Sequence, residues 1–222
     1  MAKTGASRVV RITISEQIKE QLIEDIFHHK YKPGEKMVES NLAKEFNVSQ
    51  TSIREALRSL IAMGFLESEP FKGITVRSLS KEDLVEVYTV RGTLETLAAT
   101  LAAERISDEE IKRLEDICDA MIKASEEGDV PLRIKLNINF HEALMQVSGN
   151  KLLVKLYEYL QFATWSMMTG TLSTMDSITM ATRHQKIVAA IKSRDQKKIE
   201  IAMKDHIASG SKPVLDSMET TS

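Results

Sequence analysis

Three histidines in the second half of the chain are the residues best suited to bind a metal ion: His141, His184 and His206. Each is expected on a different helix, and the three helices can line the interior of one bundle. Three imidazoles and one oxygen can hold a divalent metal with coordination positions left open. Asn137 precedes His141 by one helical turn and shares its helix face. Each histidine is also explicable as a single core or surface residue, so spacing alone leaves both interpretations open.

A polar helix face between Ser49 and Leu60 has the residue types that read DNA. Gln50 and Arg54 can each form two hydrogen bonds to a base edge, and the hydroxyls at the helix start suit phosphate oxygens. A helix face that is merely exposed is the alternative; the helix-turn-helix spacing and a Lys-Gly pair at a hairpin tip favour DNA contact. The candidate DNA-contacting residues are Ser49, Gln50, Thr51, Ser52, Arg54, Arg58, Lys72 and Gly73.

Residues 9–78 are expected to form the winged helix-turn-helix that positions this face. Thr13 and Glu16 fit a capping box, and Gly64 suits the left-handed end of a helix. After Gly64 the apolar period changes from that of a helix to that of short strands. The expected elements are three helices, from Thr13 to before Tyr31, from Ser40 to Phe46 and from Ser49 to Met63, and two strands, Phe65–Glu69 and Gly73–Arg77.

Residues 79–215 show no strand pattern and are expected to form an all-α antiparallel bundle that carries the histidines. The fold class is therefore mainly α, with residues 78–80 as the linker. We expect disordered tails at residues 1–8 and 216–222. The expected helices are Ser80–Arg105, Ser107–Gly128, Asp129–Gly149, Asn150 to about Gly170, Met175–Ser193 and Asp195 to about Gly210.

The composition limits the class of protein. Residues 1–78 carry 12 Lys/Arg and 10 Asp/Glu, whereas residues 79–222 carry 18 and 22, so the weak positive balance falls on the expected DNA-binding part. The single cysteine, Cys118, excludes a disulfide framework and suits a reducing compartment. The start of the chain has no apolar core of signal-peptide length, and no window approaches a membrane span. We expect a cytoplasmic protein.

The N-terminal motifs resemble the GntR family of bacterial regulators over residues 12–77. The resemblance rests on Tyr31-Lys-Pro-Gly34, Leu42-Ala43, and the run from Val48 through Arg54 and Arg58 to Leu60. It implies a winged-helix regulator, more often a repressor than an activator, that binds a short palindrome as a dimer. Position 50 is commonly Arg in this family and is Gln here, which changes the base expected at one operator position.

The C-terminal motifs resemble the FCD effector domain of the FadR-type branch over about residues 81–215. The resemblance rests on Arg91-Gly-Thr-Leu94-Glu95, Asn137-Ile-Asn-Phe140-His141, Ser148-Gly-Asn150, His184 and His206. It implies a divalent metal, zinc or nickel, held by an Asp and three His, with Asn137 at the Asp position. An amide oxygen is a neutral and weaker ligand than a carboxylate.

The same resemblance implies that Arg91 grips a small carboxylate effector that completes the metal coordination. The alternative for Arg91 is a helix-surface pair with Glu95, four residues on. Other members of the branch bind effectors without a metal.

These features favour an effector-responsive bacterial transcription regulator over two other classes. A constitutive DNA-binding protein would use the bundle only to dimerise and would show no effector response. A metalloenzyme with a DNA-binding appendage would use three histidines to activate water. The chain has no Glu-x-x-His pair, which argues against a di-iron bundle, and an enzyme is not expected.

Overall fold

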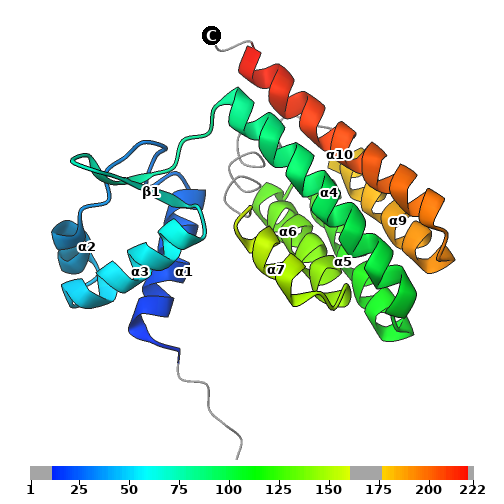
Figure 1. Cartoon of the computed structure of the whole chain (residues 1–222), viewed down its shortest axis with the longest axis horizontal. Helices are drawn as coiled ribbons and strands as arrows, with labels where there is room; N and C mark the ends of the chain where they lie inside the picture. Colours follow the sequence, from blue (N-terminus) through cyan, green and yellow to red (C-terminus); the bar gives the residue numbers. More distant parts are fainter. Residues whose placement is uncertain (1–11, 161–176, 220–222) are drawn as a thin grey trace, which may run out of the picture. The chain divides into compact units, whose positions relative to one another are not determined.

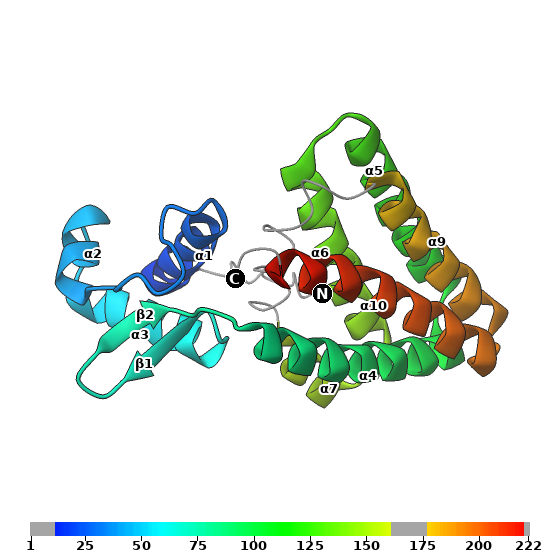
Figure 2. The same cartoon turned by 90° about the horizontal axis from the view of Figure 1, so that it is seen from above.

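The computed structural model describes residues 12–160 and 177–219 and divides into two compact units, residues 1–78 and 79–222. The first unit combines three helices with a β-hairpin, and the second is built from helices (Figures 1 and 2).

The first unit begins with α1 (Ile14–Phe27), α2 (Glu39–Glu45) and α3 (Gln50–Ala62). The Thr13 hydroxyl accepts the amide of Glu16 at the start of α1, and the Ser49 hydroxyl accepts the amide of Ser52 at the start of α3. These contacts satisfy amides that have no partner inside the helix. Gly64 follows α3 at φ +76°, a conformation that side chains disfavour, and this ends the helix.

The hairpin consists of β1 (Leu66–Glu69) and β2 (Gly73–Val76), paired antiparallel with Leu66 opposite Val76. An isolated bridge joins Lys36 to Thr75, so the chain before α2 lies along the free side of β2. The sequence analysis did not anticipate this third segment. It ties the hairpin to the helices through backbone bonds, including Met37 N–H to Ile74 C=O at 2.8 Å.

The core of the first unit forms where α3 packs against α1, α2 and β1. Ile53, Leu57 and Leu60 of α3 are completely buried, as is Leu22 of α1. These residues recur at helical spacing, so one face of α3 enters the core and the opposite face is left for solvent or a ligand.

The second unit contains six described helices: α4 (Lys81–Arg105), α5 (Asp108–Glu126), α6 (Val130–Val147), α7 (Lys151–Glu158), α9 (Ser177–Ser193) and α10 (Gln196–Glu219). Ser80 and Ser107 open α4 and α5 with capping boxes, in which Asp83 and Glu110 return hydrogen bonds to the cap amides. Asn150 caps α7 by accepting two backbone amides.

The helices of the second unit pack around one apolar cluster. α5 contacts α6 and α9, while α4 contacts α6, α7, α9 and α10 (Figure 2). Phe140 and Leu144 of α6 and Ile191 of α9 are fully buried in this cluster. None of the helices described is both long and apolar enough to cross a membrane.

Two helix ends differ from the sequence-based expectations. α10 was expected to stop near Gly210 and residues 216–222 to be disordered, but the helix continues to Glu219. The Tyr88 hydroxyl donates to the Gly210 carbonyl at 3.1 Å, and Leu215 packs against Leu84 and Tyr88 of α4. These contacts from α4 stabilise the extra turns, which local sequence does not predict.

The helix expected from Asn150 to Gly170 was also wrong in length. α7 ends at Glu158, and the amide of Leu160 turns back to the carbonyl of Tyr157 at 2.9 Å. The rest of that expected helix, and residues 1–8 of the N-terminal tail, lie outside the described residues.

Leu144→Ala should lower the free energy of unfolding by about 2–5 kcal/mol, because it leaves a cavity in the buried cluster. Leu132→Ala on the same helix, where the side chain is 42% exposed, should change it by less than about 0.5 kcal/mol. Urea unfolding followed by circular dichroism measures both. Equal losses in the two variants would contradict the assigned core.

Candidate functional site

The candidate DNA-contacting residues lie together at the start and on the outer face of α3 and at the hairpin tip. All are exposed except Ser52, which is half-buried beside its capping partner Ser49. The hydroxyls of Ser49 and Ser52 lie 3.0 Å apart, so the cap occupies part of their hydrogen-bonding capacity. The first turn of α3 still presents a positive dipole end and free side chains, which suit phosphate groups.

Arg54 is held by a residue that the sequence analysis missed. Its Nη2 lies 2.8 Å from Oε2 of Glu39, at the start of α2, and its Nε lies 3.2 Å from both carboxylate oxygens. The guanidinium lowers the pKa of Glu39. The pair is exposed and therefore contributes little to stability, and it gives Arg54 a partner in the absence of DNA.

The hairpin tip places an aromatic side chain beside the two residues expected there. Phe71 is fully exposed and adopts φ +67°, while Gly73 adopts φ +88°. Lys72 Nζ lies 2.5 Å from Oε2 of Glu69, so its charge is shared with an acidic neighbour. No sequence signal marked Phe71, because its exposure depends on the turn conformation.

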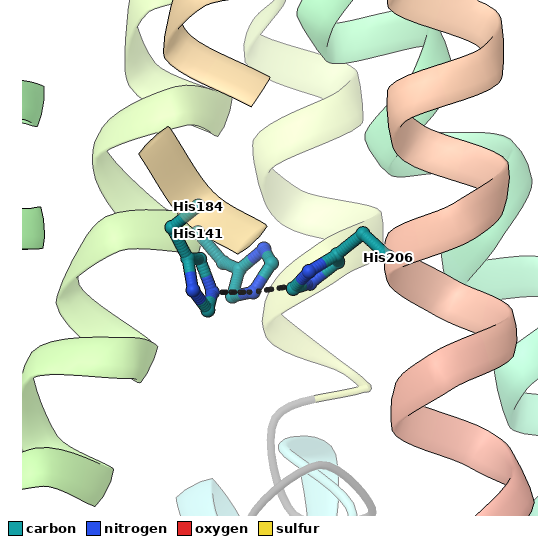
Figure 3. A group of neighbouring side chains, drawn as sticks. All are labelled: His141, His184 and His206. Atoms are coloured by element: carbon teal, nitrogen blue, oxygen red, sulfur yellow. Dashed lines mark hydrogen bonds between the residues drawn. The ribbon is translucent and has the colours of Figure 1, made fainter. Parts of the chain in front are cut away.

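The three histidines come together from α6, α9 and α10, with their rings directed toward one another (Figure 3). The Nε2 atom of His141 lies 3.4 Å from Nε2 of His184 and 3.3 Å from Nε2 of His206. One ligand nitrogen from each residue lies within 4.8 Å of the others. The buried ring of Phe140 packs edge-on against His141 and His184.

The donor set fits a divalent metal. Metal–nitrogen bonds of about 2.0–2.1 Å at tetrahedral angles place ligand nitrogens about 3.3 Å apart. Arg91 Nη2 lies 3.1 Å from His141 Nε2, and an arginine can only donate, so Nε2 carries a lone pair and Nδ1 the proton. The single lone pair of His141 Nε2 cannot accept hydrogen bonds from Arg91, His184 and His206 at once. A cation shared by the three histidines would instead satisfy one lone pair on each ring.

The surroundings favour the neutral form of His141 and His206. Burial lowers the pKa of His141, against the opposing effect of Glu95. Burial and the neighbouring rings of His184 and His141 lower the pKa of His206 well below its ordinary value. Neutral imidazoles are the form that binds metals.

Asn137, the fourth expected ligand, is buried on α6 one turn before His141. It therefore shares the helix face that carries the histidine, as expected from the spacing of four residues. The oxygen ligand remains a prediction.

Arg91 does pair with Glu95, but in the interior and not on the helix surface. Arg91 Nε lies 2.6 Å from Glu95 Oε1, with the side chains 4% and 0% exposed. The Tyr157 hydroxyl on α7 donates to the same oxygen at 2.9 Å, and His141 Nδ1 lies 3.2 Å from it. Neither Glu95 nor Tyr157 was expected at this site, although the i,i+4 spacing predicted that Arg91 and Glu95 form a pair.

The ion pair keeps both groups charged in spite of burial. Burial alone would raise the pKa of Glu95, but the charge of Arg91 holds it well below its usual value. Burial opposes the charge of Arg91 as well, yet Glu95 raises its pKa overall. Burial and Glu95 raise the pKa of Tyr157, which stays protonated and donates its hydrogen bond.

Comparison with known proteins identifies both parts of the chain. The model of the bacterial regulatory proteins of the gntR family matches residues 14–76, and the FCD domain model matches residues 86–209. The chain is a GntR-family transcription regulator. Its family and relatives are regulators and not enzymes, as expected from the sequence.

Two similar proteins are 33% and 29% identical to the regulator. The first is the uncharacterized HTH-type transcriptional regulator YdhC of Bacillus subtilis, aligned over 86% of this chain and 84% of the relative. The second is the probable D-xylose utilization operon transcriptional repressor of Paenarthrobacter nicotinovorans, aligned over 91% and 89%.

The fold of the regulator matches that of solved structures. The structure of McbR/YncC from E. coli superposes with a TM-score of 0.81 over 93% of this chain and 99% of that protein. The sequence identity is 22%, so this match bears on the fold. It confirms the predicted winged helix-turn-helix followed by a helical domain.

The metal-free regulator should lose stability as the pH falls below about 6.5, the ordinary pKa of histidine. The pKa of His141 is lowered in the folded protein, so below pH 6.5 the unfolded chain binds a proton that the folded chain excludes. The unfolded state then holds more protons, and the free energy of unfolding decreases with acidification.

Urea unfolding of chelator-treated protein between about pH 7.5 and 5.5 measures this dependence. His141→Gln should show a shallower decrease. An identical slope in the variant would assign the pH dependence to other groups.

Proposed function

We propose that this regulator binds a palindromic operator as a homodimer and that a small organic acid, bound with a divalent metal in the FCD domain, changes its DNA affinity. The observation that carries the proposal is the convergence of three histidine Nε2 atoms beside a buried arginine. A divalent cation and an anion together complement this set of neutral donors and one cationic side chain.

The DNA-binding part of the proposal rests on the exposed face of α3. Gln50, Arg54 and Arg58 are exposed on the side of the helix opposite its apolar residues. Such a face enters a major groove with its N-terminal residues at the base edges, while Lys72 and Gly73 of the hairpin approach the backbone. A two-fold dimer presents two such helices to successive grooves.

His141, His184, His206 and Asn137 would hold the metal, with zinc or nickel as the expected ion. The metal would supply a positive charge and open coordination positions for a carboxylate. The amide oxygen of Asn137 contributes no negative charge, so the site depends more on the histidines than one with a carboxylate ligand would.

Arg91 would orient the effector carboxylate. Its Nε is occupied by Glu95, while its Nη2 faces His141, so the guanidinium reaches the histidine cluster. With a cation bound at the histidines, an anion between the two positive charges is favoured.

Effector binding would change operator affinity by a coupling free energy of about 1–3 kcal/mol. Repression is the proposed direction, because relatives that include the Paenarthrobacter nicotinovorans protein are named repressors. α4 directly follows the DNA-binding unit in the chain and carries Arg91, which gives the ligand site a covalent route to that unit.

Arg54→Ala should weaken specific DNA binding by about 1–3 kcal/mol while leaving the fold intact. Fluorescence anisotropy with a duplex selected by the wild-type protein from a random library measures the affinity. Glu39→Gln is the matched control, because it breaks the same ion pair but keeps the guanidinium.

The control variant should bind DNA as well as the wild type or better, since a carboxylate near the phosphates is removed. If Glu39→Gln weakened binding as much as Arg54→Ala, the pair would act structurally and the base contact would be refuted.

Metal analysis of the purified regulator should find about one zinc or nickel per chain, and His141→Ala should lose it. His28→Ala, in the DNA-binding unit, is the matched control and should retain the metal. Metal loading should also raise the melting temperature of the wild type by mass action. No metal in the purified protein and no uptake on titration would refute the metal site and redirect the effector search to metal-free ligands.

A further inference from the structure

We infer that Glu95 is a positioning residue for the metal site: its buried carboxylate holds His141 in the tautomer and orientation that direct Nε2 toward the other two histidines. Glu95 lies on α4, outside the proposed ligand set. The inference rests on the proposed metal site and assigns a role to a residue that pairing with Arg91 alone does not explain.

The hydrogen-bond geometry determines the tautomer of His141. Arg91 Nη2 donates toward Nε2 at 3.1 Å, so in the neutral ring the proton resides on Nδ1. That nitrogen lies 3.2 Å from Oε1 of Glu95. A proton on Nδ1 next to a carboxylate puts the lone pair on Nε2, where a metal would replace the Arg91 donor; this is the usual arrangement of a metal-bound histidine and its outer carboxylate.

The contacts of Glu95 are concentrated on the oxygen that faces His141. Oε1 receives Arg91 Nε at 2.6 Å and the Tyr157 hydroxyl at 2.9 Å, in addition to its contact with His141. Oε2 is buried and has no hydrogen-bond partner among the described residues. A carboxylate that served only as a counter-ion to Arg91 would more commonly receive it on both oxygens. Here three helices direct their donors to one atom, which fixes its position.

The charge of Glu95 also favours a cation at the histidines. The site already contains the guanidinium of Arg91, whose positive charge opposes metal binding within a few ångströms. Glu95 neutralises that charge. Its carboxylate, next to the Nδ1 proton, also makes Nε2 of His141 a stronger ligand for the metal. Removal of an outer carboxylate of this kind typically weakens metal affinity by about 10–100-fold.

Glu95→Gln tests the charge with little change of shape. The side-chain carbonyl can occupy the Oε1 position, accept from Arg91 and Tyr157 and keep its place beside Nδ1 of His141. The amide nitrogen can occupy the Oε2 position, toward which no described donor is directed. Zn²⁺ affinity measured by competition with a chromophoric chelator should fall about 10–100-fold. Glu104→Gln is the matched control: it makes the same change at an exposed carboxylate of α4 and should bind Zn²⁺ as well as the wild type.

A second comparison keeps the test valid if Glu95→Gln leaves Arg91 unpaired and the protein unfolds. The double variant Arg91→Gln/Glu95→Gln removes both buried charges together, so that neither is left unpaired. It lacks the guanidinium that opposes a cation, yet it should still bind Zn²⁺ more weakly than the wild type, because His141 has lost its outer carboxylate. An affinity equal to or higher than that of the wild type would overturn the inference.

The imidazole ¹⁵N spectrum of the metal-free protein gives a readout that does not depend on the metal. His141 should show the Nδ1–H tautomer in the wild type and in Glu104→Gln, and a mixture of tautomers in Glu95→Gln. An Nε2–H tautomer of His141 in the wild type would overturn the inference, and so would an unchanged spectrum after removal of the Glu95 carboxylate. Failure of the wild type to bind any metal would instead refute the proposed function, and the tautomer measurement distinguishes the two results.

Discussion

The ion pair between Arg91 and Glu95 is the interaction on which the second unit depends most directly. Neither charge is stable in the interior alone, because the lost hydration of a buried ion costs several kcal/mol. The pair is formed within one helix, but Glu95 also accepts a hydrogen bond from Tyr157 on α7 and lies 3.2 Å from Nδ1 of His141 on α6. Satisfying one carboxylate oxygen therefore fixes the positions of three helices relative to each other.

The same constraint shapes the histidine cluster. Once His141 is fixed by Glu95 and Arg91, its Nε2 faces His184 of α9 and His206 of α10. A cluster of lone pairs in a buried place is costly unless a cation or donors satisfy them. In the surrounding core, α5 packs against α6 and α9, and α10 packs against α4 and α9. The apolar core thus brings together polar groups that a metal and an anion would complement.

The DNA-binding unit separates its two tasks on opposite faces of α3. Ile53, Leu57 and Leu60 are completely buried, whereas Gln50, Arg54 and Arg58 are exposed. Arg54 meets an acidic residue of its own chain in the absence of DNA. In the proposed complex a phosphate or a guanine edge would replace that carboxylate. DNA binding would then exchange one partner of the guanidinium for another, without forming a new charge contact from a solvated arginine.

The sequence by itself determined the start of most helices, the polar face of α3 and the residues of the histidine cluster, because caps and helical periodicity act within one or two turns. It did not determine that α10 continues to Glu219, which depends on Tyr88 and Leu215 meeting across two helices. It also left open whether the histidines meet and whether Arg91 pairs with Glu95 at the surface or in the interior. Only the tertiary structure decided these points, since burial and convergence are set by neighbours distant in the chain.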